Sequence, residues 1–219
     1  MDWRLLADVP PDEVHDLLQL ARRRRFASNE VVFHRDDPGD ALHLISKGRF
    51  SIRVMTPIGQ TATIALRGPG DSFGEMALLS EDARRSATVT AIEEAETFAV
   101  TRGDFERLRL RNPGVNELLL RFLQNEVRLL NERLLEALFV PVERRILRRL
   151  VEAAALFPHG ENEAVITLTQ ESLAELAGAS RSTVNQVLRA EERRGLIELQ
   201  RGKTYILDLA TLTQRARRH

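Results

Sequence analysis

Short runs of hydrophobic residues alternate with polar ones through the segment from Phe26 to Val100. Glycine, proline and aspartate clusters separate the runs, and this combination is typical of strands joined by tight turns. The expected strands are residues 31–33, 41–45, 50–54, 61–66, 88–91 and 97–100. Because they recur about every ten residues with glycine in the turns, they predict a small antiparallel roll or barrel.

A short helix is expected ahead of this segment. Residues 11–21 begin with proline and acidic residues, and apolar residues then recur at the spacing of an amphipathic helix. The arginine run Arg22–Arg25 follows. Two interpretations of this run stay open: an anion-binding patch, or a solvated face that precedes a strand.

A long helix is expected after the Asn112–Gly114 turn. Its apolar residues recur in steps of three and four, which is a heptad seam formed by Leu120, Leu123, Val127, Leu130, Leu134 and Ala137. A second stripe, which we expect to pack on the roll, contains Leu119, Phe122, Leu129 and Leu138. Because a helix that is apolar on two faces must bury both, the seam predicts pairing with the same helix of a second subunit. The alternative is burial within one larger core.

The C-terminal part has the pattern of a helix-turn-helix followed by a hairpin. A helix is expected over residues 143–155 and a polar loop over 157–163. Two helices then follow, with Thr169 and Ser180 as N-caps and Gly178 in the turn between them. Residues 196–199 and 204–207 predict a β-hairpin wing. The chain thus divides into residues 1–112, 113–140 and 141–219.

The second helix of this unit carries an arginine-led polar face. Recognition helices place their N-terminal residues at base edges in the major groove. Arg181 can contact guanine and Gln186 adenine, while Arg201 and Lys203 at the tip of the wing suit phosphates. The alternative is a helical pair used only for packing. The expected DNA-binding residues are Thr169, Gln170, Ser180, Arg181, Ser182, Thr183, Gln186, Arg189, Arg201 and Lys203.

The charge is uneven along the chain, although the 219 residues hold 32 Lys and Arg against 32 Asp and Glu. Residues 141–219 hold 13 basic and 10 acidic residues, a net charge of +3, so residues 1–140 carry 19 and 22, a net of −3. The mildly basic C-terminal part permits nucleic-acid binding. The chain has no cysteine, which excludes disulfides, thiolate metal sites and cysteine-held clusters. Without a signal-peptide pattern or an apolar run of about 20 residues, we expect a cytoplasmic protein with no membrane partner.

One stretch of the roll combines glycine, a carboxylate and an Arg-Ser pair. Arg85 can hold a phosphate through two hydrogen bonds, and Glu75 can accept from a sugar hydroxyl. Ser86 and backbone N–H groups would complete the anion site. Because no nucleophile lies in a pattern with a base, we expect a nucleotide sensor and not an enzyme. The alternative for Glu75 and Arg85 is a structural ion pair that closes the roll.

Taken together, these motifs resemble the cyclic-AMP receptor protein and FNR (CRP/FNR) family of bacterial transcription regulators. The resemblance rests on the glycine-punctuated roll, residues 74–76 with 85–87, the heptad helix and residues 178–184. It implies an α+β fold with three parts: an N-terminal antiparallel β-roll, jelly-roll-like, that binds cyclic nucleotides, a long dimerisation helix, and a C-terminal winged helix-turn-helix domain. It also implies a homodimer on a palindromic operator in double-stranded DNA, with cAMP as effector and no cofactor or metal.

The resemblance assigns effector roles residue by residue. The glutamate, Glu75, would contact the ribose 2′-hydroxyl and the arginine, Arg85, the cyclic phosphate. Members that respond to cAMP commonly place a Thr-Ser or Thr-Asn pair on the long helix, at positions that match Leu130 and Asn131 here. The amide of Asn131 could accept from adenine, whereas Leu130 cannot form a hydrogen bond. The expected ligand-binding residues are Gly74, Glu75, Met76, Arg85, Ser86, Ala87, Leu130 and Asn131.

Several positions of this chain depart from the family pattern and keep alternative functions open. Leu130 allows a changed or lost effector, namely cyclic GMP, cyclic di-GMP or DNA binding without any effector. A haem-based sensor would use His34 or His43, and a cupin-like enzyme would need clustered histidines that the roll lacks. The recognition helix reads Arg-Ser-Thr-Val, where the receptor-like pattern is Arg-Glu-Thr-Val, so a changed half-site is expected. We also expect a hinge near Val140–Pro141, and RNA polymerase is the further candidate partner, through surfaces that include residues 157–163.

Overall fold

The computed structural model describes residues 3–217 except 8, 57–58, 79–82 and 113. By their contacts the residues form two compact units, one made of 1–55 and 64–130 and the other of 56–63 and 131–219. Each unit is described by itself below. Within the described part, no helix is both long and apolar enough to cross a bilayer.

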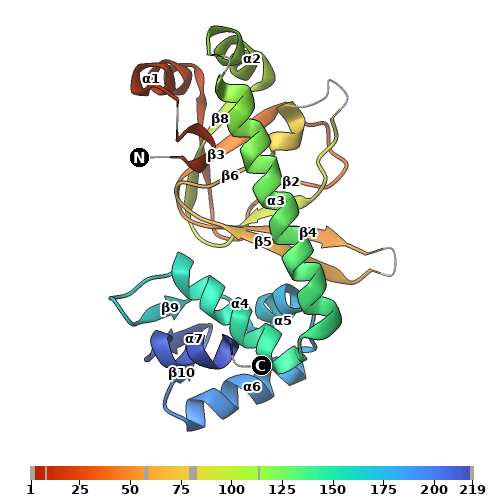
Figure 1. Ribbon diagram of the computed structural model, residues 1–219, viewed down its shortest axis with the longest axis vertical. Helices are drawn as coiled ribbons and strands as arrows, with labels where there is room; N and C mark the ends of the chain where they lie inside the picture. Colours follow the sequence, from red (N-terminus) through yellow and green to blue (C-terminus); the bar gives the residue numbers. More distant parts are fainter. Residues whose placement is uncertain (1–2, 8, 57–58, 79–82, 113, 218–219) are drawn as a thin grey trace. The chain divides into compact units, whose positions relative to one another are not determined.

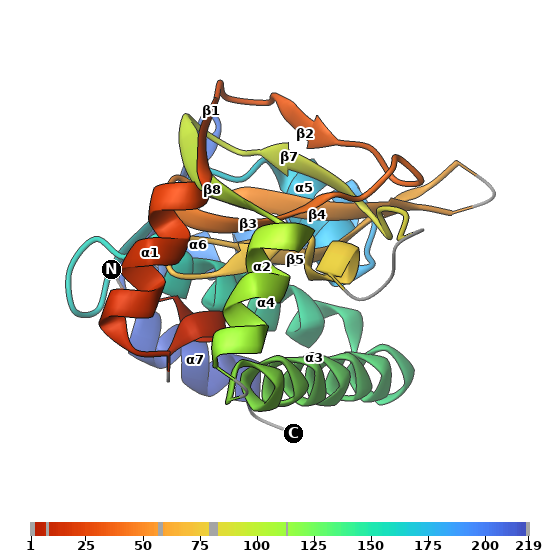
Figure 2. The same ribbon diagram turned by 90° about the horizontal axis from the view of Figure 1, so that it is seen from above.

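The first unit is built on two four-stranded sheets with the strand orders β1-β8-β3-β6 and β2-β7-β4-β5. Adjacent strands pair antiparallel, as in β3 with β8 and β4 with β7 (Figure 2). The strands are β1 (Arg22–Phe26), β2 (Val31–Phe33), β3 (Ala41–Lys47), β4 (Phe50–Met55), β5 (Thr61–Arg67), β6 (Ser72–Phe73), β7 (Thr88–Ala91) and β8 (Ala95–Thr101). The expected antiparallel roll is therefore confirmed. Arg22–Arg25 form an exposed face, as one of the two interpretations expected, but its placement ahead of a strand was wrong, because these residues lie within β1 itself, which pairs with β8.

Two apolar clusters fill the roll. One contains the aromatic residues Phe26, Phe50 and Phe73, and the other brings Leu42 and Leu44 of β3 against the helices. The alternation of strand residues explains this division, since successive side chains of a strand point to opposite faces of the sheet. Trp3 closes one end by donating its Nε1–H to the carbonyl oxygen of Ile45 at 3.0 Å.

Helices cover one side of the roll. They are η1 (Arg4–Leu6), α1 (Pro11–Leu20), η2 (Glu75–Leu78), α2 (Arg102–Arg111) and α3 (Gly114–Phe139). Figures 1 and 2 show α1 lying beside α2. Helix α2 was not expected from the sequence, because its charged residues show little helical periodicity. Its start is fixed by Thr101, which accepts a hydrogen bond from the Asp104 N–H.

Helix α3 presents two kinds of apolar residue. Leu119 is buried, and Phe122 and Leu123 pack against the core of the roll. Other large apolar residues of the helix are exposed, each by 56–76%: Leu120, Val127, Leu130, Leu134, Leu135, Leu138 and Phe139. The assignment of Leu138 to the roll-facing stripe was wrong, because this side chain is 64% exposed. Leu123 likewise belongs to the packed face and not to the open seam.

The second unit contains four helices beyond the end of α3 and a three-stranded sheet of order β10-β11-β9. Its elements are α4 (Val142–Leu156), β9 (Ala164–Ile166), α5 (Gln170–Ala177), α6 (Arg181–Arg193), β10 (Ile197–Gln200), β11 (Lys203–Ile206) and α7 (Leu209–Arg217). Figure 1 shows α7 packed along α4. The expected helices and wing are present, while β9 and α7 were not anticipated. The fully buried side chains include Ile146, Leu150, Ile166, Leu188, Ile197 and Ile206.

Ion pairs join the last turns of α3 to α4 across Pro141. The carboxylate of Glu136 accepts from Arg149 and, at 2.7 Å, from Arg148 Nη1. Arg149 Nη1 also donates to Glu152 Oε2 at 2.8 Å. The corner between the two helices is therefore fixed by charged side chains as well as by apolar packing.

Candidate effector pocket and nucleic-acid interface

Gly74 permits the close packing at the centre of the predicted effector pocket. Its φ of 84° lies in the left-handed region that favours glycine. A Cβ at this position would lie 2.7 Å from Arg85 Nη1 and 3.0 Å from the carbonyl oxygen of Ala41. Any other residue would therefore displace Arg85.

The Arg85 side chain is only 5% exposed, yet its partners are incomplete. Its Nη1 donates to the carbonyl oxygen of Ala41 at 2.8 Å and weakly to that of Gly74 at 3.4 Å. Its Nη2 lies 3.4 Å from Oδ1 of Asp40, a carboxylate that is 90% exposed. No described residue accepts from its buried Nε. The guanidinium carbon lies 4.1 Å from the ring centroid of Phe33.

Burial lowers the pKa of Arg85, whereas the carboxylates of Asp40 and Glu75 act in the opposite direction. An arginine remains cationic in any protein environment. The pocket therefore holds a buried positive charge that protein carboxylates compensate only in part.

Glu75 opens the short helix η2 next to Gly74 and is half-buried. Burial raises the pKa of its carboxyl, and the Glu126 carboxylate raises it further, while Arg67 and Arg85 oppose the shift. Arg67 itself is held by Glu126, whose two oxygens both lie 2.7 Å from Arg67 Nη2. Arg67 and Glu126 were not among the expected site residues, because nothing in the strand or heptad pattern marks them as neighbours of Glu75.

The remaining predicted ligand residues differ in exposure. Met76 is 43% exposed and Ser86 is exposed, while Ala87 is buried. Leu130 and Asn131 are both exposed on α3 in the single chain. Leu130 belongs to the first unit and Asn131 to the second. The contact of these two residues with the nucleobase of an effector stays a prediction.

The two histidines considered for a haem lie in different environments. His43 is buried, its Nδ1 lies 3.0 Å from the Thr97 hydroxyl, and its ring stacks on Phe73 at 4.9 Å. Burial, helped by the charge of Arg85, lowers its pKa to about 3. His34 is exposed. His43 is therefore a neutral core residue with its hydrogen bond satisfied.

The helix-turn-helix has the caps that its sequence predicts. Thr169 accepts from the Ser172 N–H and Ser180 from the Thr183 N–H, while Gly178 takes a left-handed conformation with a φ of 59°. Asn185 joins the two helices by donating to Gln170 Oε1 at 3.1 Å. These contacts hold the second helix, α6, at a fixed angle to α5.

Helix α6 turns polar side chains outward from a buried seam. Val184 and Leu188 are buried, whereas the outer face is exposed and consists of Arg181, Ser182, Gln186 and Arg189. The Ser180 hydroxyl lies 2.8 Å from those of both Ser182 and Thr183, so these two residues also serve the cap. Arg189 Nη1 lies 2.6 Å from Glu192 Oε2. Arg181 and Gln186 are exposed on this outer face, and their contact with base edges stays a prediction.

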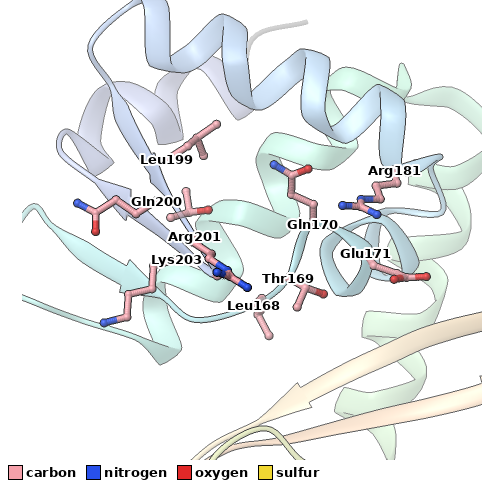
Figure 3. Close-up of a pocket in the computed structure, with 11 residues that line it drawn as sticks. Leu168, Thr169, Gln170, Glu171, Arg181, Leu199, Gln200, Arg201 and Lys203 are labelled. Carbon is pink, nitrogen blue, oxygen red and sulfur yellow. The ribbon is translucent and has the colours of Figure 1, made fainter.

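A groove of about 400 Å³ lies between α5, the start of α6 and the wing. Figure 3 shows Arg181 on one side of it and Arg201 and Lys203 on the wing side, with Thr169 and Gln170 between them. Three cationic side chains against the single carboxylate of Glu171 make the groove attractive to phosphate. The groove thus brings together residues that the sequence placed on three separate elements. It also adds Leu168, Leu199 and Gln200, for which the sequence carried no signal.

In the comparison with known proteins, two family models match separate parts of the chain. Residues 23–112 match the model of the cyclic nucleotide-binding domain, and residues 144–215 match that of the Crp-like helix-turn-helix domain. The chain is 32% identical over 212 residues to a "CRP-like cAMP-activated global transcriptional regulator" of Mycobacterium tuberculosis, covering 95% of this chain and 94% of the relative. It is also 32% identical over 210 residues to the "Cyclic AMP receptor protein" of Thermus thermophilus, covering 96% and 95%.

Solved structures agree on the fold. The Thermus thermophilus catabolite activator protein is 32% identical with a TM-score of 0.57, and the alignment covers 97% of this chain and 98% of that one. FixK2 of Bradyrhizobium japonicum has a TM-score of 0.76 over 89% of this chain and 96% of its own, at 16% identity, which shows the fold alone.

Proposed function

Because this chain belongs to the CRP/FNR family of DNA-binding transcription regulators, we propose that it is a homodimer that binds a palindromic operator in response to cAMP. The members of this family are transcription regulators and not enzymes, and this chain has both the cyclic nucleotide-binding and the helix-turn-helix domains. What the proposal adds is the identity of the effector, the oligomeric state and the symmetry of the DNA site.

The incomplete coordination of Arg85 is the observation that carries the effector proposal. A buried guanidinium with carbonyl partners, one distant carboxylate and an unpartnered Nε accepts an external anion readily. The cyclic phosphate of cAMP supplies such an anion. Glu75, the residue that follows Gly74, then accepts a hydrogen bond from the ribose 2′-hydroxyl. The cAMP-activated relatives support cAMP in preference to other cyclic nucleotides.

The exposed apolar row on α3 supports the dimer. Leu120, Val127, Leu130 and Leu134 recur at heptad spacing, and each is more than half exposed in the single chain. Pairing with the same helix of a second copy would bury this row. In such a dimer Asn131, next to the row, reaches towards the partner's effector.

The proposed dimer presents two recognition helices to DNA. Two half-sites occupy successive major grooves when the helices lie about 34 Å apart. Effector binding would set this spacing by shifting the population between two arrangements of the DNA-binding domains. Arg181 is assigned to a guanine and Gln186 to an adenine in each half-site, with Arg201 and Lys203 on phosphates.

Calorimetric titration of the full chain with cAMP, cGMP and cyclic di-GMP tests the effector. We expect saturable binding of cAMP with one site per chain, and its loss in Arg85→Met. Fluorescence anisotropy with DNA selected by the protein from a random pool then tests the switch, since cAMP should raise operator affinity. An unchanged affinity at saturating cAMP would contradict the proposal.

Leu130 supports a second candidate, the same regulator with a changed effector. Its side chain is hydrocarbon, so it supplies no hydrogen bond to the amino group of adenine. If the titration shows tighter binding of cGMP or cyclic di-GMP than of cAMP, this candidate replaces the first. DNA binding that is equal with and without all three nucleotides would indicate a regulator without an effector of this class.

A further inference from the structure

A second hollow of about 480 Å³ lies in the first unit, between η1, the turn from β5 to β6, and one flank of α3. This volume is within the range of small-molecule sites. Asn125 lies on this flank, two residues from both Leu123 and Val127. Because each residue turns a helix by about 100°, Asn125 points away from the face that holds Val127 and the exposed apolar row. The hollow is therefore separate from the proposed dimer seam.

The charge of the hollow is positive. Four arginines line it, namely Arg4, Arg67, Arg121 and Arg128, against the two carboxylates of Asp71 and Glu126. Outside the lining, Glu117 Oε2 lies 3.5 Å from Arg121 Nη2, in a pair whose side chains are both exposed. Both carboxylates of the lining are already engaged. Asp71 Oδ1 lies 3.2 Å from Arg4 Nη1 and its Oδ2 accepts from the Gly68 N–H at 2.9 Å, while Glu126 holds Arg67. The lining thus holds more arginines than carboxylates, and an arginine with its five N–H donors can bind an anion while it keeps a protein partner.

Ser72 provides an independent indication of a ligand. Its side chain is 4% exposed, it lines the hollow, and its Oγ has no hydrogen-bond partner within the described part of the chain. A buried hydroxyl without a partner is unfavourable, and native structures rarely retain one without a reason. An anionic oxygen in the hollow would accept from this hydroxyl.

The lining also includes apolar side chains, and the floor is fixed. Phe122 and Leu129 of α3 are half-buried and face the hollow together with Ala7. On the floor, the Arg4 N–H donates to the carbonyl oxygen of Gly70 at 3.0 Å, so η1 is tied to the turn from β5 to β6. The site thus combines cationic side chains, a preformed floor and apolar side chains that can contact an aromatic or aliphatic group.

We infer that this hollow is a second small-molecule site, which takes an organic phosphate. Its phosphate oxygens face Ser72, Arg121 and Arg128, and its apolar part lies on Phe122. The Arg67–Glu126 pair forms the wall between this site and Glu75 of the effector pocket, so an occupant that draws Arg67 towards its phosphate would alter the surroundings of Glu75. The two sites are therefore adjacent but use different anion-binding residues.

Trp3 offers a direct measurement, because it is the single tryptophan of the chain and lies next to Arg4. The full chain, saturated with cAMP, is titrated with ADP and with inorganic pyrophosphate while Trp3 fluorescence is followed. We expect a saturable change with both probes. The Arg121→Gln/Arg128→Gln double variant should weaken ADP binding by about tenfold or more, and Ser72→Ala by about threefold to tenfold.

Two further variants make the test specific. Phe122→Leu should weaken ADP more than pyrophosphate, because only ADP carries a base that can lie on the ring. Arg22→Gln removes an exposed arginine outside the hollow and should leave both affinities unchanged, and Arg85→Met should retain ADP binding while it loses cAMP. A signal that does not saturate, competition between ADP and cAMP for one site, or wild-type ADP affinity in the Ser72 and Arg121/Arg128 variants would each overturn the proposal.

Discussion

Arg85 in the roll and Arg149 in the DNA-binding unit are equally buried, each 5% exposed, yet they are compensated in different ways. Arg149 donates to two carboxylates, those of Glu136 and Glu152. Arg85 donates mainly to the carbonyl oxygen of Ala41, and its carboxylate partner, Asp40, lies 3.4 Å away on the surface. Both cations are buried at a cost in desolvation, but the carboxylates of the protein compensate Arg85 less completely than Arg149.

This is the difference that we expect between a structural arginine and one that binds a ligand. The negative charges that stabilise Arg149 belong to α3 and α4, so its bonds are complete within the fold. The carbonyl oxygens of Ala41 and Gly74 hold the Arg85 side chain in place without neutralising its charge. A buried arginine whose hydrogen bonds go to carbonyl oxygens is therefore a better indication of an anion site than its burial alone.

The largest effect is expected from Arg149→Met. Removing one member of a buried ion pair leaves its partner charged and uncompensated, which costs about 3–5 kcal/mol. We expect the lower part of this range, about 3 kcal/mol, because Arg148 still contacts Glu136. Urea denaturation of the full chain measures the free energy of unfolding. The matched Arg85→Met variant should lose less than about 1 kcal/mol, and equal losses in the two variants would remove the distinction between them.

The same Arg149→Met variant bears on the expected hinge. The ion pairs of Glu136 with Arg148 and Arg149 join segments on both sides of Pro141. Bending at Val140–Pro141 would have to separate them. If that position is the hinge, Arg149→Met should alter operator affinity without cAMP, in addition to its effect on stability.

The second effect concerns ligand affinity. Arg85→Met should weaken cAMP binding by about 100-fold or more, because two charge-assisted hydrogen bonds to the phosphate are lost. Isothermal titration calorimetry measures this change. Arg149→Met, measured without urea and at a temperature at which it remains folded, should bind cAMP with the affinity of the wild type. Retained affinity in Arg85→Met would show that the phosphate lies elsewhere.

The third effect is a pH dependence that originates beside Arg85. The pKa of His43 is about 3 in the folded state, below its ordinary value of 6.5. At a pH between these two values, the unfolded chain therefore binds a proton at this histidine that the folded chain does not bind. The contribution of His43 to the free energy of unfolding is complete above pH 6.5 and falls as the pH decreases. The slope is about 1.4 kcal/mol per pH unit within this window. Denaturation of the wild type and His43→Phe between pH 7 and 5 measures the contribution, and parallel curves would contradict it.

The sequence predicted most of the fold, for reasons that are local. Strand alternation, the glycine turns and the caps at Thr169 and Ser180 all depend on neighbouring residues. Helix α2 was not predicted because its sequence is mostly charged. Leu138 was assigned to the wrong face because periodicity does not indicate how far along α3 the roll extends. In the site, Gly74, Glu75 and Arg85 carried a recognisable motif. Asp40, Arg67 and Glu126 did not, since they approach the motif only through strand pairing and the packing of α3.

The smallest effect is expected from Asp40→Asn. This exposed carboxylate lies at 3.4 Å from Arg85 Nη2, and exposed ion pairs of this kind contribute less than about 1 kcal/mol. The free energy of unfolding should therefore change little. Its effect on cAMP should be opposite in sign to that of Arg85→Met, because removing Asp40 leaves the phosphate as the main anionic partner of Arg85. A modest gain in affinity, of about twofold to fivefold, is expected by calorimetry. A loss of affinity would mean that Asp40 positions Arg85 for the ligand and does not compete with it, and the two buried arginines would then both depend on carboxylates of the protein.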